Sequence, residues 1–359
     1  MIMKNTIPTL LLDKKKCIQN IQKIFNKTKR NQVKFRPHFK THQSIEVGNW
    51  FKEYGVNAIT VSSVKMAKYF SNDWKDILVA FPVNILEIKE INELAEKLKL
   101  TLLIENIEAL SYLASNLTSP VYYYIKIDIG YHRTGINPKD ENIIEQLMRF
   151  KSDKLNFIGF LGHAGHSYKC RSEKEILEIH TESITVLKNL KSKYISEFPN
   201  LLLSTGDTPT CSIAEDFSGI DEIRPGNFVF YDLTQNNIGS NSQAEIAVCM
   251  ECPVVAIHNE RNEVIIYGGG VHFAKDFLIH KEYGTIYGLV VNNTDWSQSI
   301  EGCYIKSLSQ EHGILQVSDE FLHSLTIGDT VHILPVHSCM TANSMKEYVT
   351  LDGDVISRL

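Results

Sequence analysis

Between Val33 and Tyr231, short apolar runs alternate with amphipathic stretches of helix length, and this alternation limits the folds open to the chain. Eight apolar runs can be counted: 33–37, 58–61, 77–81, 100–104, 121–127, 156–161, 201–204 and 223–230. In the stretches between them, such as 84–98, 107–117, 142–150 and 173–194, apolar residues recur at helical spacing. A strand followed by a helix, repeated eight times, predicts a parallel (β/α)8 TIM barrel of the α/β class.

After Tyr231 the pattern changes to short β-rich runs joined by Gly, Asn and Asp turns. The runs are 244–258, 263–267, 285–291, 314–317 and 330–334. The run 9–12 precedes the first predicted helix, 13–25, so we expect it to pair with this C-terminal β-domain rather than with the barrel. The predicted domains are therefore the barrel, 13–235, and a β-rich domain of 1–12 plus 236–359.

Bulk properties exclude several classes of function. The 37 basic and 42 acidic residues give a formal net charge of -5, which argues against a nucleic acid partner. No apolar run reaches the roughly 18 residues of a membrane span, and no secretory signal is visible, so we expect a cytoplasmic protein. An odd number of cysteines, seven, fits a reducing compartment better than a disulfide framework. Cys249 and Cys252 have the spacing of a metal or redox pair, but without a second pair we interpret them as strand cysteines.

Lys40 lies between His38 and His42, directly after the first predicted strand. A lysine becomes a nucleophile when burial or neighbouring cations make its ammonium easier to deprotonate. Since the active site of a (β/α)8 barrel forms at the C-terminal ends of its strands, Lys40 is the first candidate for covalent catalysis. The alternative is a strand end that carries ordinary solvated side chains.

Polar segments also follow the fifth, sixth and seventh predicted strands, at 127–135, 162–168 and 204–210. Barrels often bind a phosphate between the loops after strands seven and eight. The segment 206–210 offers a glycine for close backbone approach, hydroxyl groups and a proline in a first helical turn, and 224–227 follows in the next loop. A phosphate there, with a lysine across the barrel mouth, describes the anchoring of pyridoxal 5'-phosphate.

Five segments resemble, in order, the D-serine dehydratase and D-threonine aldolase family. They are RPHFKTH at 36–42, GHAGHSY at 162–168, GDTPT at 206–210, RPGN at 224–227 and PVHSC at 335–339. This family belongs to the alanine-racemase-like, fold type III class of pyridoxal phosphate enzymes, which combine a barrel with a β-domain. The resemblance runs over almost the whole chain.

The resemblance implies a role for each predicted site residue. Lys40 would form the covalent link to pyridoxal phosphate and act as the catalytic base. The phosphate would be held by Thr208, Gly226 and Asn227.

The resemblance also implies which side chains surround the cofactor ring. Tyr168 would contact the cofactor and His163 would line it. In this class an arginine faces the pyridine nitrogen and leaves it unprotonated; we assign Arg133 this role, with Arg224 as the second choice. The alternatives are a surface salt bridge for Arg133 and a core histidine for His163.

His337 and Cys339 are two residues apart, so on an extended strand both side chains would leave the same face. Imidazole and thiolate together favour zinc, although a structural zinc site has four ligands and a histidine beside a buried cysteine is the alternative. The resemblance implies that this pair binds a divalent metal, with zinc favoured. His-x-Cys is similar to the dehydratase branch, whereas the aldolase branch places a carboxylate in the ligand pair.

The resemblance implies a lyase whose substrate is a small D-β-hydroxy amino acid. Our hypothesis is dehydration of D-serine to pyruvate and ammonia, and the alternative is aldolase-type cleavage of a substrate such as D-threonine to glycine and an aldehyde. A racemase requires a second base, which we cannot assign among Tyr267, Tyr283, Tyr287 and Tyr304. A non-catalytic carrier of pyridoxal phosphate would resemble the barrel alone. The family also implies a homodimer.

Overall fold

A computed structural model describes residues 5–359 and divides them into two compact units. One unit is Gln22–Gly226, and the other joins the segment up to Ile21 to Asn227–Arg358. These divisions fall close to the boundaries predicted from the sequence, 12/13 and 235/236, but assign the beginning of the first helix to the β-rich unit. Residues 1–4 of the predicted β-rich domain lie outside the described residues.

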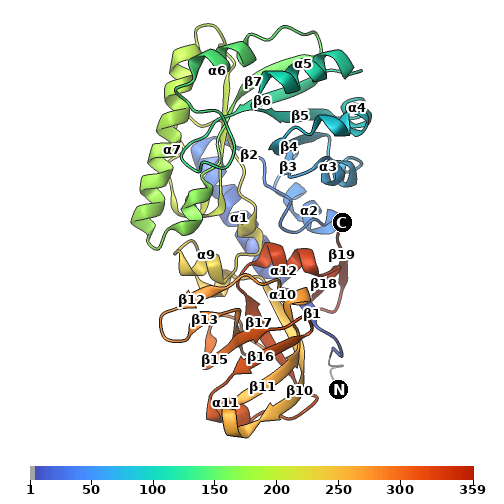
Figure 1. Cartoon of the computed structure of the whole chain (residues 1–359), viewed down its shortest axis with the longest axis vertical. Helices are drawn as coiled ribbons and strands as arrows, with labels where there is room; N and C mark the ends of the chain where they lie inside the picture. Colours follow the sequence, from blue (N-terminus) through green and yellow to red (C-terminus); the bar gives the residue numbers. More distant parts are fainter. Residues whose placement is uncertain (1–4) are drawn as a thin grey trace. The chain divides into compact units, whose positions relative to one another are not determined.

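The first unit contains a parallel eight-stranded sheet in the order β2-β9-β8-β7-β6-β5-β4-β3. Figure 1 labels β2 to β7 of this sheet. The strands are β2 (Lys34–Phe35), β3 (Ile59–Val61), β4 (Asp76–Pro82), β5 (Lys99–Ile104), β6 (Val121–Lys126), β7 (Leu155–Leu161), β8 (Leu202–Thr205) and β9 (Glu222–Ile223). The sheet closes where His38, just after β2, bridges Thr60 of β3 in parallel register, and Phe39 N donates to Thr60 O at 2.8 Å. This closure confirms the predicted (β/α)8 barrel.

Helices follow the strands, and most of them begin at a residue whose side chain caps the first turn. They are α1 (Lys14–Asn31), α2 (Ile45–Lys52), α3 (Val64–Phe70), α4 (Ile88–Ala95), α5 (Ile107–Asn116), α6 (Glu141–Met148), α7 (Glu173–Tyr194) and α8 (Thr208–Ile213). The side chains of Ser44, Ser63, Asn106, Asp140, Ser172 and Asp207 each accept a backbone N–H of the first helical turn. Helix α7 spans the residues predicted for it. None of the helices formed by residues 5–359 is both long and apolar enough to cross a membrane.

The eighth strand is shorter than predicted. The sequence suggested 223–230, but β9 ends at Ile223, and Asn227–Val229 forms a turn of 3-10 helix, η3. The cause is Pro225, which has no N–H to donate to a strand ladder, although its carbonyl still accepts from His38 N at 2.9 Å.

The second unit is built on a nine-stranded, mostly antiparallel sheet in the order β11-β16-β15-β14-β17-β10-β1-β18-β19, and a further β11–β10 pairing closes part of it into a barrel. Its strands are β1 (Thr9–Leu12), β10 (Val248–His258), β11 (Glu263–Tyr267), β14 (Gly288–Val291), β15 (Ser299–Leu308), β16 (His312–Gln316), β17 (Thr330–Pro335), β18 (Glu347–Thr350) and β19 (Val355–Ser357), with β12 (Leu278–His280) and β13 (Gly284–Ile286) as a separate ribbon. Strand β1 pairs with β10 and β18, which confirms the prediction for 9–12. Cys249 and Cys252 are buried strand residues of β10, as interpreted.

Strands β7 and β8 approach so closely that one position requires glycine. Gly159 has φ +154°, and a Cβ there would lie 1.9 Å from the carbonyl oxygen of Leu202. We expect Gly159→Ala to lower the thermal unfolding midpoint far more than Gly55→Ala, because Gly55 also has a positive φ, +75°, but no atom lies within 4 Å of the place that its Cβ would take. The control should cost about 1–2 kcal/mol from backbone strain alone. Equal midpoints for the two variants in differential scanning calorimetry would contradict this account of the close approach of β7 and β8.

Candidate active site

The turn that carries Lys40 is anchored on both sides by buried rings. Phe39 packs against Phe51 and Trp74, with ring centroids 5.2 and 5.1 Å away, and His42 is fully buried with its ring 4.4 Å from Phe39. Lys40 itself is exposed in this turn, directly after the first barrel strand. His42 is therefore a core residue that fixes the backbone around Lys40.

Four basic residues, which we call the basic cluster, interact electrostatically with one another, and two of them, His38 and His163, also interact with Lys40. The cluster consists of His38, Lys126, His163 and Arg224. Burial, and then the charge of Lys40, holds the pKa of His38 well below its usual value. Burial, followed by Lys126 and Lys40, does the same for the pKa of His163, so both imidazoles are neutral at physiological pH. The cluster thus combines cationic side chains with neutral donors, an environment that favours an anionic ligand.

Sequence reasoning missed Lys126. It is 5% exposed, and among residues 5–359 its Nζ bonds only to the carbonyl oxygen of Ile127, at 3.4 Å. Burial, and then the charges of Arg224 and Arg133, lower its pKa to about 7. The available signal was a single lysine at the end of an otherwise apolar and aromatic strand, where a buried cation is costly and therefore often functional.

The loop after β8 is built around Asp207, which caps α8. Its carboxylate accepts from Thr210 N at 2.9 Å, Thr210 Oγ1 at 2.7 Å and Ser167 Oγ at 2.7 Å. Complete burial raises the pKa of Asp207 to about 6. The hydrogen bond from Ser167 ties the His-Ser-Tyr segment, which forms a 3-10 helix, η2 (Gly165–Lys169), to the first turn of α8, where Thr208 lies buried. Tyr168 is partly buried in the same turn.

At two glycines, Gly206 and Gly226, neighbouring backbone segments approach each other so closely that a side chain would not fit. A Cβ on Gly206, whose φ is +134°, would lie 2.5 Å from Arg224 N, and a Cβ on Gly226 would lie 2.8 Å from His38 O. In the part of the chain that the structure describes, the backbone N–H groups of Gly226 and Asn227 donate no hydrogen bond. Buried backbone donors are normally paired, so these two groups, together with the basic cluster, fit an anion such as a phosphate.

The two arginines considered for the pyridine nitrogen have different surroundings. Arg133 is exposed on the loop after β6, with its guanidinium carbon 4.8 Å from the centroid of the Tyr131 ring. Arg224 is 4% exposed, and it donates from Nε to Ser204 Oγ at 2.7 Å and from Nη2 to Gly162 O at 2.6 Å. The geometry therefore favours Arg224, the second choice from the sequence.

The predicted metal pair belongs to the β-rich unit, and its local structure differs from the prediction. His337 and Cys339 do not lie on an extended strand: β17 ends at Pro335, His337 is the N-cap of α12 (Ser338–Ser344), and Cys339 is in its first turn. The helix begins here because Asp232 accepts from both Ser338 N and Ser338 Oγ, at 3.0 and 3.1 Å.

The side chains of His337 and Cys339 nevertheless meet. Burial would lower the pKa of His337, but the carboxylate of Asp276, whose Oδ1 lies 3.1 Å from Nδ1, and the hydrogen-bonded sulfur of Cys339 raise it to about 11. Asn227 Nδ2 also lies 3.4 Å from Cys339 Sγ. Within residues 5–359 no group of three or more His, Cys, Asp and Glu side chains is placed to bind a metal, so the pair offers an incomplete ligand set.

Comparison with known proteins places the chain in a family. The family described as "Alanine racemase, N-terminal domain" matches residues 12–233, and "Putative serine dehydratase domain" matches residues 247–351. D-serine dehydratase of Dictyostelium discoideum is 30% identical over 90% of this chain and 87% of its own length. The chain belongs to the D-serine dehydratase family. D-threo-3-hydroxyaspartate dehydratase of Delftia sp. is 25% identical over 97% of this chain and 94% of its own length.

A solved structure of D-threo-3-hydroxyaspartate dehydratase, a cysteine-to-alanine mutant in the metal-free form, has the same fold. It superposes with a TM-score of 0.91 and 24% sequence identity, and the match covers 99% of this chain and 97% of that chain. Membership of the D-serine dehydratase family makes this protein a lyase with an alanine-racemase-like fold. The family implies pyridoxal phosphate and a metal.

Lys126 yields a prediction about pH and stability. Its folded pKa, about 7, lies below the ordinary lysine value of 10.5, so the folded state releases a proton that the unfolded state keeps between these pH values. Stability should therefore rise from about pH 7 to pH 10. We expect Lys126→Met to remove this rise and to stabilise the protein at pH 7, on the order of a few kcal/mol.

Denaturant unfolding at several pH values, with no added ligand, measures this effect. The exposed Lys139 offers a matched control, since Lys139→Met should retain the rise. An unchanged pH slope in Lys126→Met would show that the buried ammonium is not its source.

Proposed function

We propose that this lyase removes water from a small D-β-hydroxy amino acid, D-serine first, to give a 2-oxo acid and ammonia. The observation that carries the proposal is the exposed Lys40 beside the basic cluster and two backbone N–H groups, those of Gly226 and Asn227, that are unpaired among residues 5–359. The names of the relatives support the substrate class. A homodimer in the cytoplasm, with no nucleic acid or membrane partner, is part of the same proposal.

Pyridoxal phosphate fits the residues at the strand ends and in the loops after β2, β7, β8 and β9. The backbone N–H groups of Gly226 and Asn227, with Thr208 at the start of α8, would hold the phosphate. His163, whose Nδ1 lies 3.1 Å from Gly206 O, and Tyr168 would line the cofactor.

Lys40 and Arg224 would act on the cofactor ring and the substrate. Arg224 would face the pyridine nitrogen in place of Arg133, because Arg224 is the buried one of the two. When bound, the cofactor withdraws electrons from the substrate Cα. Lys40 would hold the cofactor covalently, and its Nζ would then accept the proton of the substrate Cα.

The donor set of His337 and Cys339 fits a divalent metal, with zinc favoured. Imidazole and thiolate suit this ion, and two protein ligands leave positions open for a substrate oxygen. Asp276 bonds to Nδ1 of His337 and thereby leaves Nε2 for the metal. A metal there would act as a Lewis acid on the β-hydroxyl.

The runner-up is cleavage of a D-β-hydroxy amino acid such as D-threonine to glycine and an aldehyde. In that reaction a base removes the hydroxyl proton and the α-proton stays, so the products separate the two activities. A racemase would release neither product, and a carrier of pyridoxal phosphate would turn over none of these substrates.

A first test measures products from a panel of D-amino acids. We expect pyruvate from D-serine and loss of most of this activity after chelation, with recovery when zinc is added back. Glycine and an aldehyde from D-threonine, without a 2-oxo acid from D-serine, would establish the aldolase instead. Unchanged turnover in metal-free protein would remove the metal role of His337 and Cys339.

A second test concerns the covalent link. Lys40→Ala should eliminate the visible absorbance band of the bound cofactor and reduce turnover by several orders of magnitude, because no other residue carries the attachment. The surface lysine variant Lys65→Ala is the control and should keep both. A retained band in Lys40→Ala would exclude Lys40 from the mechanism.

A further inference from the structure

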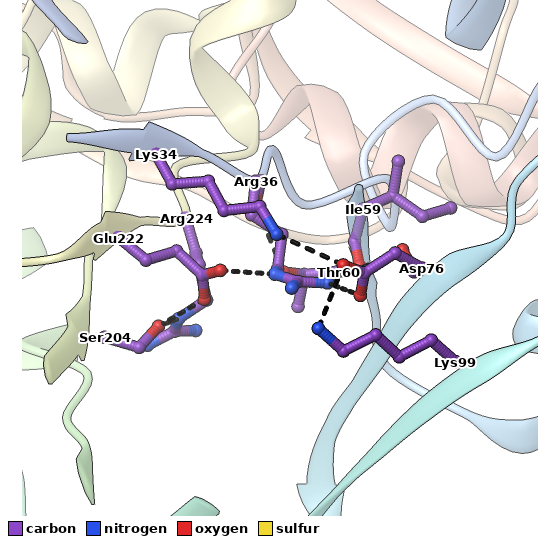
Figure 2. A network of polar contacts seen from close by, with 9 residues as sticks. All are labelled: Lys34, Arg36, Ile59, Thr60, Asp76, Lys99, Ser204, Glu222 and Arg224. Carbon is purple, nitrogen blue, oxygen red and sulfur yellow. Dashed lines mark hydrogen bonds and ion pairs between the residues drawn. The ribbon is translucent and has the colours of Figure 1, made fainter. Parts of the chain in front are cut away.

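A continuous chain of polar contacts crosses the interior of the barrel (Figure 2). Arg36 bonds through Nη1 to Asp76 Oδ1 at 2.7 Å and through Nε to Glu222 Oε2 at 2.5 Å. Ser204 Oγ lies 2.8 Å from Glu222 Oε1 and 2.7 Å from Nε of Arg224. The chain therefore ends at the arginine that the proposed function assigns to the pyridine nitrogen.

The direction of the hydrogen bonds in this chain is fixed. Nε of Arg224 can only donate, so Ser204 Oγ accepts from it, and the Ser204 hydroxyl gives its own proton to Glu222 Oε1. The lone pairs of Ser204 Oγ then face Arg224. Ser204 thus bridges the buried Glu222 carboxylate and Arg224, so the position of the carboxylate fixes that of the guanidinium. Glu222 and Arg224 share no direct hydrogen bond among the described residues.

Only a carboxylate satisfies both neighbours of Glu222. One oxygen accepts from Arg36 and the other accepts from Ser204. A glutamine at this position would place its NH2 group either against the Nε–H of Arg36 or against Ser204. In the first case two donors meet, and in the second the Ser204 hydroxyl is left with two donors and no acceptor.

One nitrogen of the Arg224 guanidinium, Nη1, is available to a ligand. Its Nε is held by Ser204 and its Nη2 by Gly162, whereas Nη1 makes no hydrogen bond within the described residues. Burial lowers the pKa of Arg224 to about 10, so the group is still a cation at neutral pH. The guanidinium is consequently fixed on one edge and presents Nη1 to a ligand.

We propose that Ser204 and Glu222 are positioning residues that orient Arg224 towards the ring nitrogen of the cofactor. This inference rests on the proposed function, since it requires that Arg224 contacts the cofactor. Arg36 holds the far oxygen of Glu222 and keeps the carboxylate in place from the other side.

The test uses the holoprotein and compares Ser204→Ala, Ser204→Thr and Glu222→Gln. We expect Ser204→Ala and Glu222→Gln to weaken pyridoxal phosphate binding about tenfold or more and to shift the absorbance maximum of the bound cofactor or the pH midpoint of its titration. Ser204→Thr keeps the hydroxyl and should restore both values. A purely structural role would change the unfolding midpoint without moving the spectrum.

Ser183→Ala is the matched control, because Ser183 on α7 is equally buried but its hydroxyl has no hydrogen-bond partner among the described residues. An unchanged spectrum and affinity in Ser204→Ala and Glu222→Gln would overturn the inference. If Arg224→Lys alters the spectrum in that case, the cofactor contact of Arg224 stands and only the positioning role fails. If Arg224→Lys leaves the spectrum unchanged as well, the assignment of Arg224 in the proposed function fails too.

Discussion

The pairing of residues 36–39 with both neighbouring strands holds the barrel and its candidate site together. On one side Arg36 N and His38 N donate to Ile223 O and Pro225 O, at 3.0 and 2.9 Å. On the other side Thr60 N donates to Pro37 O at 2.9 Å. The same segment therefore closes the sheet, starts the turn that exposes Lys40 and requires glycine at position 226, where any side chain would meet His38.

The sequence could predict those parts of the fold that leave an apolar pattern along the chain. Buried parallel strands are apolar on both faces, so the eight runs and their order along the chain could be identified from the sequence. Helix α7 was readable because its apolar residues recur over many turns. Strand β15 was missed, since Glu301, Gly302 and Lys306 interrupt its apolar pattern. The end of β9 depends on Pro225, which falls inside an otherwise apolar run.

The sequence could predict the site residues that lie at strand ends. It could not predict those whose position depends on tertiary contacts. Lys40 and the loop after β8 follow from position at strand ends, and the positions of Lys40 and Thr208 agree with that reasoning. The backbone of 337–339 could not be derived from spacing, because the carboxylate of Asp232, more than a hundred residues earlier in the chain, starts α12 there. Likewise, the choice of Arg224 over Arg133 for the pyridine nitrogen depends on burial, which the sequence does not give.

The basic side chains of the barrel differ in whether a carboxylate neutralises them, and this difference bears on how an anionic cofactor would bind. In the buried part of this chain of contacts, Arg36 and Arg224 are matched by Glu222 and Asp76, and Asp76 also pairs with the more exposed Lys34 and Lys99. Lys126 and Lys40 have no carboxylate in hydrogen-bond contact among the described residues. A buried cation without a partner, such as Lys126, is destabilising, and the cost falls when an anion binds beside it. The balanced network can therefore fix the orientation of Arg224, while the unbalanced lysines supply the attraction for an anionic cofactor.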